Sequence, residues 1–141
     1  MAVKIKTSIP GPKSLLLGQR RSSSVAKGHG TVCNVYIEKA EGSLLKDVDG
    51  NIFIDFAGGI GTMNVGHSHP EILKRIKSQL DKYSHTCFSV APYESYIELA
   101  ERLSELVPIS GAPKAAFFNS GAEAVENAIK ISRSFSKRTG V

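Results

Sequence analysis

An apolar run followed by an amphipathic helix near the C-terminus is the feature that most restricts the fold of this chain. Residues 115–118 form a continuous apolar run behind a Gly-Ala-Pro turn, which predicts a buried strand. The next segment is predicted to be a helix that begins near Gly121, with Gly140 at the C′ position past its end. One face of this helix is mostly apolar, through Val125, Ala128, Ile129, Ser132 and Phe135. Strand, turn and helix in this order make an α/β unit, whose helix packs on a sheet.

The turn before this helix consists of three small residues, Ser120, Gly121 and Ala122. Ser120 and Glu123 have the spacing of a capping box, in which each side chain satisfies a backbone N–H of the first helical turn. The free N–H groups and the positive end of the helix dipole also suit a phosphate, which small residues allow to approach. Neither G-x-x-x-x-G-K-[ST] nor G-x-G-x-x-G is present, so the turn alone favours an ordinary capped helix over a phosphate site.

The positive charge of the chain is concentrated at its start. The formal net charge is +5, but residues 1–30 contain no acidic residue. We expect a basic arm on the protein surface here, because Pro10-Gly11-Pro12 interrupts an amphipathic transit helix and no aromatic residue is available to stack on bases. We therefore expect no nucleic-acid partner, and the apolar runs are too short to cross a membrane. The basic residues of the arm are Lys4, Lys6, Lys13, Arg20, Arg21 and Lys27.

The cysteine and histidine patterns are ordinary. Cys33 and Cys87 are far apart and form no C-x-x-C, so two ordinary buried or half-buried thiols in a reducing cytoplasm are favoured over a disulfide. His67 and His69, with His85, have a spacing that a metal could use, but a glycine-rich turn before a helix favours packing and hydrogen bonding, and we expect no metal. Asp47, Asp49 and Asp55 lie around the hairpin and are assigned to turn and surface roles.

The middle of the chain is predicted to be a small antiparallel meander. Asp49-Gly50-Asn51 is a hairpin signal between two runs of alternating polarity. The glycine-rich residues 57–70 have no helical period and are expected to form a close-packed or ligand-facing loop. The three expected strands are residues 32–37, 43–48 and 52–56.

Two further helices are expected before the strand-turn-helix unit. Pro70 occupies an N1 position, and a second helix follows Pro92 and stops at Pro108. Since a single buried strand cannot satisfy its backbone alone, we expect the chain to be part of a larger sheet protein. The expected organisation is an arm at 1–30, a meander at 31–66 and an incomplete α/β portion at 67–141.

Five separated blocks of the sequence, in this order, closely resemble class III aminotransferases, and among them the 4-aminobutyrate type. The resemblance extends over nearly all of the chain from Ile9 onward. The blocks are IPGPKS at 9–14, EGSLLKDVDGNIFIDFAGGIGTMNVGHSHP at 41–70, SHTCF at 84–88, PYESYIELAERL at 92–103 and NSGAEAVENAIKISR at 119–133.

The resemblance implies an α/β fold that is the N-terminal fragment of a fold-type I transferase dependent on pyridoxal 5'-phosphate (PLP). The fragment would comprise the small-domain antiparallel meander and the start of the large α/β/α domain. By the same resemblance Ser120, Gly121 and Ala122 hold the cofactor phosphate, and Ile60 and Cys87 lie at the substrate pocket. The cofactor-linked lysine and the other catalytic residues of the family lie beyond the matched segment, so no catalytic residue is assigned.

The implied reaction moves the amino group of an ω-amino acid such as 4-aminobutyrate to 2-oxoglutarate, in a homodimer or larger assembly. The segment alone is expected to be inactive. Two alternatives stay open: another class III activity, with ornithine or another ω-amino donor or as an aminomutase, and a non-catalytic remnant of the fold.

Overall fold

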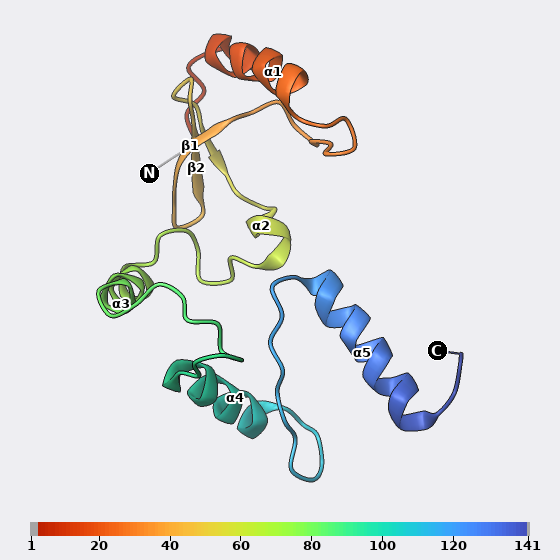
Figure 1. Cartoon of the computed structure of the whole chain (residues 1–141). Coiled ribbons are helices and arrows are strands. Elements are labelled where there is room, and N and C mark those ends of the chain that lie inside the picture. The colour runs from red at the N-terminus through yellow and green to blue at the C-terminus, as the bar shows by residue number, and fades with distance from the viewer. Residues whose placement is uncertain (1–2, 141) are drawn as a thin grey trace. The chain divides into compact units, whose positions relative to one another are not determined.

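The computed structural model describes residues 3–140 and is shown in Figure 1. The chain divides into two compact units, Met1–Ser84 and His85–Val141. The first unit contains α1 (Pro12–Ser24), β1 (Ile37–Glu41), β2 (Leu44–Asp47), β3 (Ile52–Ile54), α2 (Gly58–Gly61) and α3 (Pro70–Leu80). The second unit contains α4 (Glu94–Leu106) and α5 (Gly121–Ser136).

The three strands form an antiparallel meander in the order β1-β2-β3, as predicted. Leu45 of the central strand β2 lies opposite Ala40 of β1 and Phe53 of β3. The first strand was expected at 32–37 but begins at Ile37, because only residues from there onward face β2. The expected hairpin turn is present, and Gly50 adopts a φ of 85° that suits a residue without Cβ.

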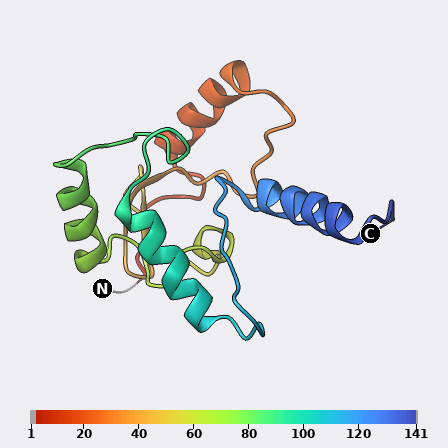
Figure 2. The same cartoon turned by 60° about the horizontal axis from the view of Figure 1, so that its bottom comes forward.

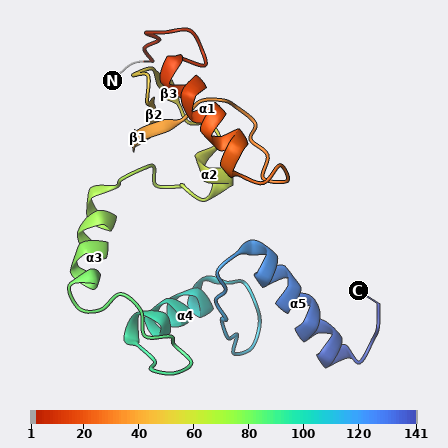
Figure 3. The same cartoon turned by 45° about the horizontal axis from the view of Figure 1, so that its top comes forward.

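Helix α1 corrects the prediction of a plain surface arm at residues 1–30. Pro12 interrupts no helix; it stands at the first position of one, where its missing N–H has no partner to lose. Figures 1 and 3 show α1 beside the end of the sheet that carries the β2–β3 turn. Ahead of the helix, Lys4 pairs with Ile52 through two backbone hydrogen bonds of 3.1 and 2.7 Å. The basic segment is therefore anchored to the sheet.

The centre of the first unit is polar. Within residues 3–140 no apolar side chain is buried, whereas Asn51, Asp47 and Ser14 are. Asn51 Oδ1 accepts the backbone N–H of Lys6 at 2.7 Å and of Thr7 at 3.0 Å, and Asn51 Nδ2 donates to Asp47 Oδ2 at 2.7 Å. Since these buried polar groups are mutually satisfied, the cluster stabilises the unit and fixes where the N-terminal segment lies.

Asp49, in the same turn, caps α1. Its carboxylate accepts the N–H of Lys13 at 2.7 Å, the N–H of Ser14 at 3.0 Å and the hydroxyl of Ser14 at 2.6 Å. Desolvation raises the pKa of Asp49, but these hydrogen bonds outweigh it and hold the pKa below its usual value. Gly11 must be glycine here, because a Cβ would lie 2.4 Å from Asp49 Cγ.

The helices α3, α4 and α5 begin where the sequence predicted. Pro70 is the first residue of α3, and α4 starts two residues after Pro92 and ends before Pro108. Helix α5 ends earlier than expected: Lys137, with a φ of 56°, takes the left-handed C-cap and its N–H bonds to Arg133 O at 2.9 Å. Gly140 therefore does not occupy the C′ position.

The segment before α5 is not a strand in the described part of the chain. Residues 113–118 run back past α4 as irregular backbone (Figure 2), because no neighbouring strand offers a ladder. Side chains of α4 supply some of the hydrogen bonds that a neighbouring strand would otherwise provide. The Tyr96 hydroxyl accepts the N–H of Phe117 at 3.2 Å, and the Ser104 hydroxyl donates to Pro113 O at 3.1 Å. The rings of Tyr96 and Phe117 also pack edge to face, 4.7 Å apart.

We predict that Asn51→Ala destabilises the protein by about 2 to 4 kcal/mol, because it leaves two backbone N–H groups and one oxygen of the buried Asp47 carboxylate without a partner. Denaturant unfolding measures the loss, and amide exchange should accelerate at Lys6 and Thr7. Asn64→Ala is the matched control, since Asn64 is exposed and has no hydrogen bond among residues 3–140. Equal stability of the two variants would contradict the role of Asn51.

Candidate functional site

The N-terminus of α5 has the predicted capping box. The N–H of Glu123 donates to Ser120 Oγ at 3.2 Å, and Glu123 Oε2 accepts the N–H of Ser120 at 3.1 Å. The same carboxylate oxygen accepts the N–H of Asn119 at 2.8 Å. The first helical bond runs from Ala124 N–H to Ser120 O at 3.0 Å. The capping box therefore satisfies the N–H groups of Asn119, Ser120 and Glu123 and leaves those of Gly121 and Ala122.

The N–H groups of Gly121 and Ala122 have no hydrogen-bond partner among the described residues. Both residues are exposed, and a Cβ on Gly121 would meet no atom within 4 Å. Neither packing nor a positive φ requires glycine at this position. Two free donors at a helix N-terminus beside open space fit a phosphate group, which the helix dipole also favours.

A second special backbone segment is the short element α2. Gly58, Gly59, Ile60 and Gly61 have φ values of 50°, 60°, 59° and 77°, so the expected loop is one turn of left-handed helix. It is closed by hydrogen bonds from Gly61 N–H to Ala57 O at 3.1 Å and from Thr62 N–H to Gly58 O at 2.9 Å. Three glycines make this handedness accessible, whereas Ile60 carries a strain of roughly 1 to 2 kcal/mol. Its side chain is 95% exposed.

Asp55 holds the start of this turn and also contacts His67, at the far end of the loop that follows the turn. Asp55 Oδ1 accepts the N–H of Ala57 at 3.0 Å and of Gly58 at 2.9 Å, and Oδ2 lies 2.6 Å from His67 Nε2. The Asp55 side chain is only 8% exposed. The hydrogen bond with His67, and then those from the two amides, lower its pKa against the opposing effect of desolvation. Of the turn and surface roles expected for Asp55, the turn role is thus confirmed and the surface role is wrong, while His67 has the hydrogen-bonding role expected of it.

A local signal for the Asp55 contacts was present in the sequence. An aspartate whose carboxylate accepts the N–H groups two and three residues later is an Asx-type turn, and Asp55 precedes the small residues Ala57 and Gly58. The contact with His67 crosses from the strand end to the far side of the loop, and sequence spacing does not predict it.

Cys87 also adopts a left-handed backbone, with a φ of 56°. Its carbonyl accepts the N–H of Val90 at 2.8 Å and of Ala91 at 3.0 Å, which closes a tight exposed turn. Cys87 belongs to the same unit as Ser120, Gly121 and Ala122, and Ile60 belongs to the other unit. Cys33 and Cys87 are free thiols, as expected, but both are exposed, so the buried or half-buried placement expected of them is wrong.

Other candidate sites in the described residues are less developed. No three His, Cys, Asp or Glu side chains within residues 3–140 gather as metal ligands. Over the same residues no helix has the length and apolar character to cross a membrane. Lys130 Nζ forms an ion pair with Glu126 Oε1 at 2.6 Å on the exposed surface of α5, one turn along the helix.

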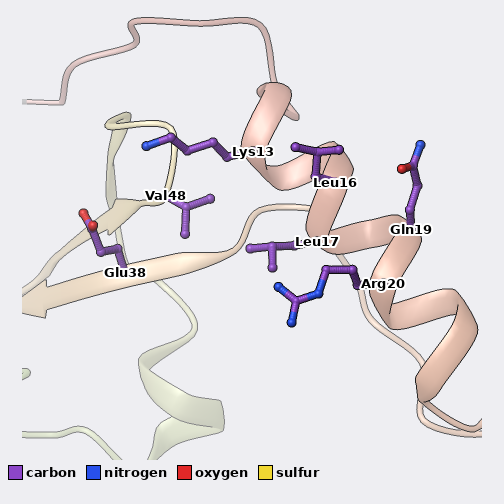
Figure 4. A pocket seen from close by; sticks show the side chains of 7 residues that line it. All are labelled: Lys13, Leu16, Leu17, Gln19, Arg20, Glu38 and Val48. Carbon is purple, nitrogen blue, oxygen red and sulfur yellow. The ribbon is translucent and has the colours of Figure 1, made fainter.

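An open hollow of about 570 Å³ lies between α1 and the sheet (Figure 4). Leu17 and Val48 face it, and Lys13, Arg20 and Glu38 stand at its edges. Its lining residues are Lys13, Leu16, Leu17, Gln19, Arg20, Glu38 and Val48. None of them is a site residue expected from the sequence.

The lowered pKa of Asp55 predicts how the turn responds to acid. The ionised carboxylate stabilises the fold fully above the ordinary aspartate pKa of about 3.9, and this contribution is lost as the pH falls through the lowered folded value. NMR signals of the Ala57 and Gly58 amides should therefore stay constant down to about pH 4 and shift below it. Asp55→Asn should remove the shift; a midpoint above the ordinary aspartate value would contradict the geometry.

Comparison with known proteins identifies the family. The model of the family "Aminotransferase class-III" matches residues 24–141. The chain is 43% identical over 138 residues to a 4-aminobutyrate aminotransferase of Mycobacterium bovis, covering 98% of this chain and 31% of that protein. It is 48% identical over 123 residues to the 5-aminovalerate aminotransferase DavT of Pseudomonas aeruginosa, covering 87% of this chain and 29% of that protein.

A solved structure has the same fold. The taurine:2-oxoglutarate aminotransferase of Bifidobacterium kashiwanohense, in complex with PLP and glutamate, superposes with a TM-score of 0.77 at 28% identity. The match covers 89% of this chain and 28% of that protein. The chain thus spans about three tenths of the length of the relatives it matches. Because the family model covers most of its residues, the chain belongs to the class III aminotransferases.

Proposed function

We propose that this chain is the N-terminal, cofactor-phosphate-binding portion of an aminotransferase that transfers the amino group of an ω-amino acid to 2-oxoglutarate. The observation that carries the proposal is the N-terminus of α5, where the N–H groups of Gly121 and Ala122 are free beside open space. In a class III aminotransferase, an anion-binding helix end of this kind suits the phosphate of PLP.

The three small residues would divide the work of holding that phosphate. The N–H groups of Gly121 and Ala122 would donate to its oxygens, and the Ser120 hydroxyl, whose oxygen already accepts from Glu123, keeps a proton that it donates. The helix dipole adds a positive field at the same place. PLP, when bound, supplies the electron sink through which an amino group leaves one carbon and joins another.

The amino donor that we propose is 4-aminobutyrate, because the matched Mycobacterium relative acts on it according to its name. The donor 5-aminovalerate is a second candidate, since DavT is 48% identical over 123 residues. These donors differ by one methylene group. By the resemblance to the family, Ile60 and Cys87 would each line the pocket for the donor chain, and each has a left-handed backbone, with φ values of 59° and 56°.

The compartment, the assembly and the domain division of the enzyme are also proposals. We propose a cytoplasmic enzyme, because Cys33 and Cys87 are free thiols that suit a reducing compartment. We also propose that it acts as a homodimer or larger assembly, with residues 31–66 in its small domain and 67–141 opening its large domain. Exposed apolar side chains such as Ile76 of α3 and Phe135 of α5 need such further packing.

The phosphate role predicts the effect of Gly121→Asp in the full enzyme. The new carboxylate fills the open space and repels a phosphate, while an acidic residue at the helix start does not harm the helix. PLP affinity should fall by roughly 10-fold or more, measured by equilibrium dialysis with inorganic phosphate as competitor. Gly140→Asp is the matched control, because Gly140 is also open and lies outside the helix. Unchanged PLP affinity in Gly121→Asp would contradict the site.

The reaction predicts that the full enzyme, loaded with PLP, forms glutamate from 2-oxoglutarate when 4-aminobutyrate is present. Parallel assays with 5-aminovalerate, ornithine and an α-amino acid rank the donors by kcat/KM. We expect kcat/KM for 4-aminobutyrate and for 5-aminovalerate to exceed kcat/KM for ornithine. Enzyme that retains PLP but forms no glutamate with any ω-amino donor would exclude the proposed reaction.

A further inference from the structure

We propose that Asp55 is a positioning residue that fixes the place of Ile60 and thereby sets the preferred length of the amino donor. The inference rests on the proposed function, in which Ile60 lines the donor pocket. In this role Asp55 contacts neither the donor nor the cofactor. Asp55 acts through the backbone of the left-handed turn.

The side chain of Ile60 has little packing within its own unit. It is 95% exposed, so packing within the first unit does not decide where it lies. Its position depends on the backbone, which at Ile60 has a φ of 59° and ψ of 51°. A β-branched residue leaves that conformation unless the surrounding structure imposes it.

Asp55 imposes the left-handed backbone of Ile60 from both ends of the loop. Oδ1 holds the start of the turn through the N–H groups of Ala57 and Gly58, and Oδ2 holds the far end of the loop through His67. His67 is in turn bound to the β1–β2 turn, because its N–H and carbonyl exchange hydrogen bonds of 2.8 and 2.9 Å with Gly42.

The strand end completes the closure. Asp55 N–H donates to Ser43 O at 2.8 Å, so the clamping residue is itself fixed to the sheet. Gly66 passes so near Gly42 that a Cβ on it would lie 3.1 Å from the Gly42 backbone, and this close approach brings His67 within reach of Asp55. The Asp55 carboxylate, together with the Gly42–His67 backbone pair, therefore closes residues 57–67 into a loop tied to the β1–β2 turn.

The rigidity of the left-handed turn bears on the selectivity for donor length. Two donors that differ by one methylene are distinguished only where an apolar wall stands at a fixed distance from the reacting amino group. A turn that is free to relax moves Ile60 and accepts both lengths. The clamp should therefore govern the ratio of kcat/KM for 4-aminobutyrate to that for 5-aminovalerate more strongly than it governs kcat.

The test compares Asp55→Ala, Asp55→Asn and Asp49→Ala in the full enzyme. Asp55→Ala should move the donor ratio toward one by about 10-fold, the lower end of what one methylene is worth, and mainly through KM. Asp55→Asn should recover most of the ratio, since its amide oxygen still accepts both N–H groups and its NH₂ donates to His67. Asp49→Ala is the matched control: it also removes a carboxylate that accepts two backbone N–H groups, but at α1, and should leave the ratio unchanged.

A double-mutant cycle separates positioning from general damage. Ile60→Gly removes both the strained residue and its side chain, so adding Asp55→Ala to it should change the donor ratio no further. A change of the same size in both backgrounds would overturn the inference. So would a wild-type ratio in Asp55→Ala.

Amide exchange makes the test independent of activity. The N–H groups of Thr62 and Met63, which bond to Gly58 O at 2.9 Å, should exchange faster in Asp55→Ala and not in Asp49→Ala. Unchanged exchange in Asp55→Ala would overturn the clamp even if no donor were turned over. Faster exchange with no ω-amino transfer by the wild type would instead retain the clamp and reject the proposed function.

Discussion

Asn51 and Asp49, two residues of a single tight turn, bind the backbone of residues that precede them by 35 to 45 positions. Asn51 holds the segment before α1, and Asp49 caps the helix itself. Because no apolar side chain is buried among residues 3–140, these polar contacts do in the first unit what an apolar core does elsewhere. The position of the sheet, and of the left-handed turn that extends from its last strand, depends on them.

The helices of the second unit likewise keep their apolar faces exposed. The Phe135 side chain of α5 is 90% exposed, and Val125 on the same face is exposed too. Local terms then decide whether α5 forms: the Ser120–Glu123 capping box supplies roughly 0.5 to 2 kcal/mol, and the Glu126–Lys130 pair a few tenths of a kcal/mol. The relatives are about three times as long as the matched segment, which agrees with helices that pack on further protein.

Sequence patterns predicted the elements whose causes are local. The start of α3 at Pro70, the capping box at Ser120 and the hairpin turn at Gly50 each follow from one residue type at one position. Features that depend on distant partners were missed: α1 is fixed by Asp49, and the left-handed turn is fixed by Asp55 together with a histidine twelve residues later. The expected strand at 115–118 failed for the same reason, since a strand exists only beside another strand.

The two candidate binding surfaces have a common physical basis, because in both the backbone, more than any side chain, defines the geometry. At α5 the donors are main-chain N–H groups, and Gly121 matters for the space it leaves. At α2 three glycines allow a left-handed turn whose one side chain is Ile60. Residues that act in this way carry no charge or nucleophile, so a search for reactive side chains passes over them. A carboxylate that positions such backbone, as Asp55 does, has a specific effect without touching a substrate.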